Sequence, residues 1–160
     1  MGLDASVYCN CYATGRVKSP PPFKELVYVD TDGDTYIHTD DDSKYFAVED
    51  WKKTACAHED MILIHRRLGN MSGIGQTSSC IKRLSQEKGL FFPVLLNKVL
   101  YSGTHACDQL DLPDVKALAE ELEIIKNVRS YKIDKVTRRV INDLTDLCDQ
   151  AMVVKNPIVF

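Results

Sequence analysis

Apolar and polar positions alternate strictly near the start of the chain, over residues 4–12. Ala5, Val7, Cys9 and Cys11 fall on one face of this segment, and polar or aromatic residues fall on the other. An alternation of period two is typical of a half-buried β-strand. We therefore expect both cysteines on the apolar side, where a free cysteine packs as a small hydrophobic residue.

A β-hairpin is predicted for residues 26–39. Residues 26–30 and 35–39 are rich in β-branched and aromatic side chains. The Asp32-Gly33 pair between them is typical of a two-residue type I′ turn, in which both central residues have positive φ. A β-branched side chain resists positive φ, so Gly33→Val is expected to destabilise the fold.

The same segment also resembles the start of a calcium-binding loop, because Asp30, Asp32 and Asp34 occupy alternate positions. Such a loop needs glycine at its sixth position and glutamate at its twelfth. This chain has Thr35 and Asp41 there, and its flanking residues are strand-like instead of helical. The hairpin is therefore favoured over a calcium site.

The rest of the chain is mostly helical in pattern. A short helix is predicted over about residues 48–57, and the apolar run at residues 61–65 predicts a buried central strand that is broken at residues 68–70. Residues 157–160 predict a terminal strand. Between these strands, apolar residues recur at helical spacing in four segments: residues 74–84, 91–101, 111–125 and 136–151.

Strands come first and helices follow, which predicts an α+β fold. We expect a small, mainly antiparallel sheet from the N-terminal half, with helices packed on one face. The length of 160 residues and the hydrophobic fraction of 44% fit one globular domain over residues 1–160.

The composition of the chain limits which partners and which cellular compartment we expect for it. The net charge of −3 argues against a nucleic-acid partner. No apolar run approaches the roughly 18 residues of a membrane span. The N-terminus lacks the basic region and apolar core of a signal peptide, and the six cysteines lie within apolar patterns. These features predict a reduced, cytoplasmic protein.

Two doublets, Cys9-x-Cys11 and Cys56-x-His58, carry the ligand types that zinc prefers. Neither has Cys-x-x-Cys spacing. On a helix, Cys56 and His58 would diverge by roughly 200°, and they could converge only if the helix ended between them. We therefore expect these residues to pack as ordinary core residues and not to converge on a common metal, so no cofactor and less than stoichiometric zinc are predicted.

A third doublet, His105-x-Cys107, precedes Asp108 and suggests a cysteine nucleophile with a histidine base. Residues two apart rarely bring their side chains together, and a nucleophile also needs an oxyanion hole. We therefore predict that His105 and Asp108 bond the loop backbone, that no residue is catalytic and that the protein is not an enzyme.

Acidic residues give two candidate partner-binding surfaces. Asp143, Asp146 and Asp149 are spaced three apart on the last predicted helix and form a negative stripe, and residues Asp40, Asp41 and Asp42 form a second acidic group. Such surfaces suit capture of a basic protein through charge complementarity. The alternative is a solvated face of the fold with no partner.

Several segments resemble immunity proteins of bacterial polymorphic toxin systems. They are residues 92–97 (Phe-Pro-Val-Leu-Leu-Asn), 100–103 (Leu-Tyr-Ser-Gly), 117–125 and 140–147, about a third of the chain. The chain has Asn142 where that family typically has tryptophan. The N-terminal half is similar to uncharacterised bacterial cytosolic proteins. The resemblance implies a protein that binds and blocks a cognate toxin.

The favoured interpretation is therefore a protein-binding module, with an immunity protein directed against a basic toxin domain as its most specific form. The alternative is a zinc-binding protein or a hydrolase built on three doublets: Cys9 with Cys11, Cys56 with His58, and His105 with Cys107.

Overall fold

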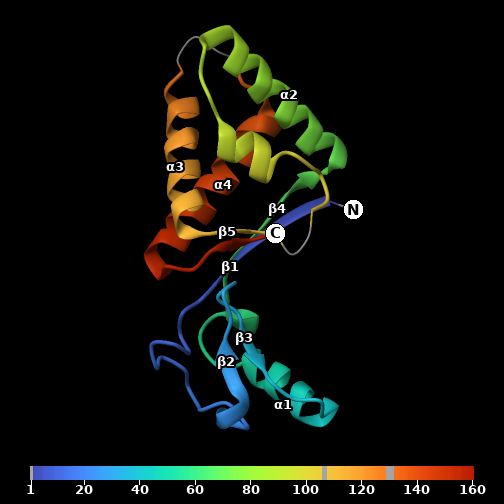
Figure 1. Ribbon diagram of the computed structural model, residues 1–160, viewed down its shortest axis with the longest axis vertical. Helices are drawn as coiled ribbons and strands as arrows, with labels where there is room; N and C mark the ends of the chain where they lie inside the picture. The colour runs from blue at the N-terminus through green and yellow to red at the C-terminus, as the bar shows by residue number, and fades with distance from the viewer. Residues whose placement is uncertain (1, 106–107, 129–131) are drawn as a thin grey trace.

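Strand β1 (Gly2–Tyr8) lies inside a four-stranded sheet in the order β4 (Ile62–Asn70), β1, β6 (Ile158–Val159) and β5 (Gln109–Leu110) (Figure 1). All three pairings are antiparallel. The computed structural model describes residues 2–105, 108–128 and 132–160. The small antiparallel sheet is confirmed, but two of its strands, β5 and β6, come from the C-terminal half of the chain.

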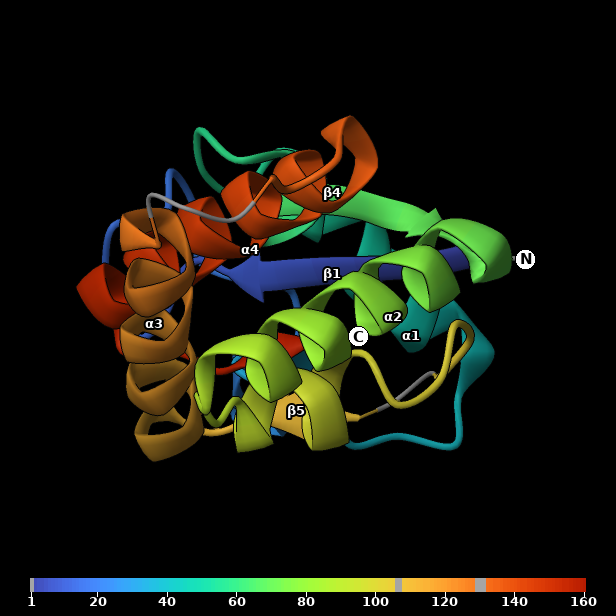
Figure 2. The same cartoon turned by 90° about the horizontal axis from the view of Figure 1, so that it is seen from above.

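Helices α2 (Met71–Lys88), α3 (Leu112–Asn127) and α4 (Lys135–Val154) lie together on one side of this sheet (Figures 1 and 2). The alternation of β1 places Leu3, Ala5 and Val7 against them, each 1% exposed or less. Their apolar stripes complete one large hydrophobic cluster with the sheet. The predicted α+β class is confirmed. No helix in the described residues is long and apolar enough to span a membrane.

A buried carboxylate anchors the π-helical turn η3 (Leu95–Val99) to α3. The Glu121 side chain accepts hydrogen bonds from the backbone N–H groups of Val94 and Leu95, at 2.9 and 2.8 Å. Burial raises the pKa of this carboxyl group. The interaction satisfies donors that a helix start leaves without intrahelical partners.

A second, smaller hydrophobic cluster lies on the opposite side of the sheet. The elements on this side are the two-stranded sheet of β2 (Val27–Val29) and β3 (Thr35–Ile37), helix α1 (Asp42–Lys52), and the short 3₁₀ helices η1 (Lys24–Leu26) and η2 (Glu59–Met61) (Figure 1). The buried residues of the second cluster are Cys9, Cys11, Val48, Trp51, Ala55, Cys56 and Met61. The assignment of one domain stays a prediction.

Helix α1 begins and ends earlier than predicted. The Asp41 side chain caps its start by accepting from the backbone N–H of Ser43 at 3.0 Å. The helix ends at Lys52, so Cys56 and His58 follow it in a loop. The predicted helix over residues 48–57 placed Cys56 on the helix, and that placement is wrong.

The hairpin is confirmed, but its turn differs from the predicted type. Val29 pairs with Thr35, and Asp30 N–H donates to Asp34 O at 3.0 Å, which leaves a three-residue loop. Within it only Gly33 has positive φ, at 84°, as expected for a type I turn followed by a glycine bulge. The two-residue type I′ prediction is therefore wrong.

The acidic stretch of the hairpin is partly buried and is not simply a solvated loop. Asp34 is 6% exposed, and both of its carboxylate oxygens lie 2.8 Å from the Lys52 ammonium group. Asp32 accepts a hydrogen bond from the Tyr36 hydroxyl at 2.8 Å. This ion pair joins α1 to the hairpin. Loss of either partner would leave an uncompensated buried charge, which is strongly destabilising.

The apolar run before residue 65 forms an edge strand instead of a central one. β4 pairs with β1 alone among the described strands, and it continues through Leu68 and Gly69 to Asn70. An irregularity in the register opposite Leu3 and Asp4 accommodates Leu68. The predicted break at residues 68–70 is therefore wrong, and α2 begins directly where β4 ends.

Gly33→Val should lower the free energy of unfolding by more than Gly15→Val does. Both glycines have positive φ, so valine costs about 1–3 kcal/mol of backbone strain at either position. A Cβ at Gly33 would also lie 2.8 Å from the Asn156 side chain, whereas a Cβ at Gly15 meets nothing within 4 Å. Chemical denaturation of the two variants measures the difference, and equal losses would contradict the close approach of Asn156.

Candidate metal centre

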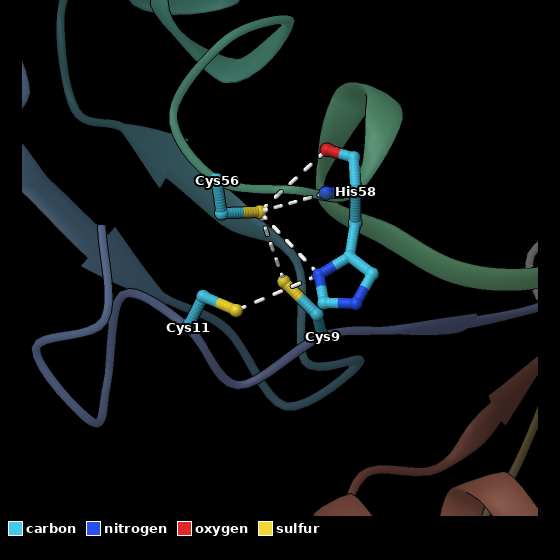
Figure 3. A group of neighbouring side chains, drawn as sticks. All are labelled: Cys9, Cys11, Cys56 and His58. Carbon is cyan, nitrogen blue, oxygen red and sulfur yellow. Dashed lines mark hydrogen bonds between the residues drawn. The ribbon is translucent and has the colours of Figure 1, made fainter. Parts of the chain in front are cut away.

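Two segments that the hairpin and α1 separate in the sequence meet in the second cluster. Cys9 and Cys11 follow β1, and the Cys9 N–H donates to Met61 O at 2.8 Å, which holds this segment beside the chain that enters β4. Cys56 and His58 lie in the loop between α1 and η2. Figure 3 shows all four side chains directed toward one another.

The four potential ligand atoms, three Sγ and the His58 Nδ1, all lie within 4.8 Å of one another. Sγ of Cys9 and Sγ of Cys56 are 3.7 Å apart. The His58 Nδ1 lies 3.5 Å from Sγ of Cys11 and 3.5 Å from Sγ of Cys56. The remaining separations are therefore at most 4.8 Å.

The three shortest of these separations, 3.7, 3.5 and 3.5 Å, are close to the edges of a tetrahedral zinc site. Zinc–sulfur bonds of about 2.3 Å and zinc–nitrogen bonds of about 2.0–2.1 Å place two sulfurs about 3.8 Å apart and a sulfur and a nitrogen about 3.6 Å apart. A disulfide would instead need sulfurs about 2.05 Å apart, and Cys9, Cys11 and Cys56 are all free.

Burial shapes the chemistry of the cluster. The three cysteines are at most 5% exposed. Burial raises the pKa of the Cys9 thiol to about 12, although a backbone hydrogen bond from Cys11 acts in the opposite direction. A thiol of this kind is a poor nucleophile at neutral pH without a metal, whereas coordination to a divalent ion deprotonates it outright. The Cys9 thiol is therefore a better metal ligand than nucleophile.

The prediction that Cys9, Cys11, Cys56 and His58 do not converge is wrong. It treated Cys56 and His58 as helical, but α1 ends at Lys52 and the loop turns both side chains inward. Since the expectation of less than stoichiometric zinc depended on the four residues lying apart, this geometry removes the reason for it. The signal that could have placed the loop is the polar stretch after residue 56, Ala-His-Glu-Asp, which has no helical apolar spacing.

The third doublet does not join this cluster. His105 stacks between Tyr101 and Phe160, with ring centroids 4.7 and 4.8 Å away. Its Nε2 lies 2.9 Å from Val99 O, and its Nδ1 lies 3.3 Å from the Asp108 carboxylate without the angle of a hydrogen bond. Cys107 lies outside the described residues, so the predicted pair with His105 stays a prediction.

The acidic stripe on α4 is partly neutralised within the chain. Asp143 lies 3.6 Å from Arg66 and 3.4 Å from Arg139, and Asp146 lies 3.2 Å from Arg66. Asp149 is exposed and makes no ion pair with any described residue. Asp40, Asp41 and Asp42 are all exposed around the start of α1.

No protein-family model, curated protein or solved structure matches this chain. The resemblance to immunity proteins stays a prediction.

Proposed function

We propose that this is a zinc-binding protein in which Cys9, Cys11, Cys56 and His58 hold one structural zinc ion. The observation that carries the proposal is the convergence of three thiols and one imidazole nitrogen within 4.8 Å of one another, with three of the separations close to a tetrahedral edge. Four protein ligands leave no open position for substrate, which is the arrangement of structural sites and not of catalytic ones.

The role of the ion follows from the size of the surrounding core. The second cluster has seven buried hydrophobic residues, and three of them are the cysteines. A core this small contributes little stability alone, and small folds commonly add a metal. The two halves of the ligand set are separated by the hairpin and α1, so a bound ion closes a long loop and reduces the entropy of the unfolded chain.

Purified protein should contain one zinc per chain, and Cys56→Ala should lower this well below one. Cys148→Ala is the matched control, because Cys148 is an equally buried cysteine in the other cluster. Elemental analysis measures the content, and cobalt substitution should give the visible absorption of a tetrahedral thiolate site. Zinc-free protein from zinc-supplemented medium, or equal loss in both variants, would contradict the proposal.

Removal of zinc by a chelator should loosen one side of the sheet selectively. Amide hydrogen exchange should speed up in β2, β3 and α1, which depend on the second cluster, whereas α2, α3 and α4 should keep their protection. The helices serve as an internal control. Uniform loss of protection, or no change after zinc has left, would show that the cluster does not depend on the ion.

A protein-binding role is a second candidate, and the surface of α1 favours it. Tyr45 and Phe46 are 46% and 63% exposed beside the acidic residues 40–42. Aromatic residues are enriched at protein interfaces, and nearby carboxylates would attract a basic partner. The stripe of Asp143, Asp146 and Asp149 is a weaker candidate, since Arg66 and Arg139 already pair with two of its members.

Phe46→Ala combined with Asp42→Lys should abolish capture of a partner in pull-downs from the native lysate, because both the apolar contact and the attraction are removed. Phe91→Ala is the control, since Phe91 is 84% exposed at a distant place in the chain. Asp41 is left unchanged because it caps α1. A partner retained by the double variant, or lost equally in Phe91→Ala, would contradict binding through α1.

A further inference from the structure

A basic hollow lies where β4 ends, between the first turns of α2 and α4. Its volume is about 670 Å³, within the roughly 300–1,000 Å³ of small-molecule sites. Three basic residues line it, Arg67, Lys135 and Arg139. Its lining includes no acidic residue among the described parts of the chain. In a protein of net charge −3, this is a local concentration of positive charge.

Arg139 is held in place at the hollow. Its Nη2 donates to the carbonyl oxygen of Arg67 at 2.6 Å, and its Nε lies 3.4 Å from the Asp143 carboxylate. A guanidinium group has five N–H donors, so others are left for a ligand. Neither Arg67 nor Lys135 makes a side-chain ion pair with a described residue, although Asp4 lies opposite Arg67 in the β1–β4 register and Asp134 precedes Lys135.

The beginning of α2 leaves room beside these charges. Gly73 lies in its first turn, where a Cβ would sit 3.3 Å from the Asn70 side chain and 3.7 Å from the Val136 methyl group of the facing helix. Glycine weakens a helix relative to alanine, and here it keeps the gap open. Ser72 and Gln76 add polar side chains, and the N-termini of both helices carry partial positive charge.

The hollow also has an apolar wall. Leu68 and Val136 line it together with the basic residues. A ligand that fills this space therefore needs a compact anionic group next to an apolar one. The volume also exceeds what a single inorganic anion occupies.

We propose that this hollow binds the phosphate monoester of a small organic molecule, with Lys135 and Arg139 contacting the phosphate and Leu68 and Val136 contacting the organic group. Arginine and lysine are the side chains that recognise phosphate. The site lies at the α2 and α4 end of β4, apart from the Cys9 cluster, and does not depend on zinc.

Phenyl phosphate is the probe, because it joins one phosphate to one apolar ring. Titration followed by amide NMR should shift the signals of residues 70–76 and 135–139. Lys135→Gln with Arg139→Gln should weaken binding about tenfold or more, since charge-assisted hydrogen bonds are lost. Lys132→Gln with Arg138→Gln is the matched control, because it removes two exposed positive charges from the same segment and should leave the affinity within about twofold.

Gly73→Ala provides a second variant that changes no charge, and it should weaken binding by filling the gap. Equal weakening by both charge pairs, signal shifts elsewhere in the chain, or equal binding of phenol would overturn the proposal. Tighter binding of a single-stranded oligonucleotide, undiminished in the Lys135 and Arg139 variant, would also overturn it. Zinc content is measured in every variant, so protein with full zinc and no phosphate binding contradicts this proposal alone.

Discussion

The antiparallel register of β1 against β4 decides where the chemistry of this protein lies. Tyr8 pairs with Ile62, and the next residue, Cys9, bonds to Met61. This register brings the cysteines after β1 beside the loop before β4, so two doublets that are far apart in sequence become neighbours. At the other end of the pair, β4 leads directly into α2, where the basic hollow forms.

The segment around β1 contributes to both hydrophobic clusters. Leu3, Ala5 and Val7 of β1 pack under the helices, whereas Cys9 and Cys11, which follow the strand, belong to the second cluster. The first cluster is large and closed by three helices. The second is small, and its centre is made of the four candidate ligands, so the proposed zinc ion would supply much of what holds it together.

Carboxylates inside the fold explain why negative net charge does not make a uniformly negative surface. Asp34 pairs with Lys52, Glu121 caps η3, and Asp143 pairs with two arginines. These contacts keep part of the acidic composition from acting on a partner. Arg67 and Lys135 make no ion pair with a described residue, and they line a hollow whose described lining includes no carboxylate.

The sequence by itself determined the elements with clear local periodicity. The hairpin and the helical spacing of α2, α3 and α4 were predicted correctly, because the burial of one face imposes those periods locally. The strand predicted over residues 4–12 is correct only in its first part, since β1 ends at Tyr8. It also gave the ligand types of the two doublets. The tertiary structure decided the end of α1, which depends on how the chain must turn to reach β4, and the edge position of β4, which depends on strands formed by the last residues. It also decided the convergence of Cys9, Cys11, Cys56 and His58, because the spacing within each doublet carries no information about the register that joins them.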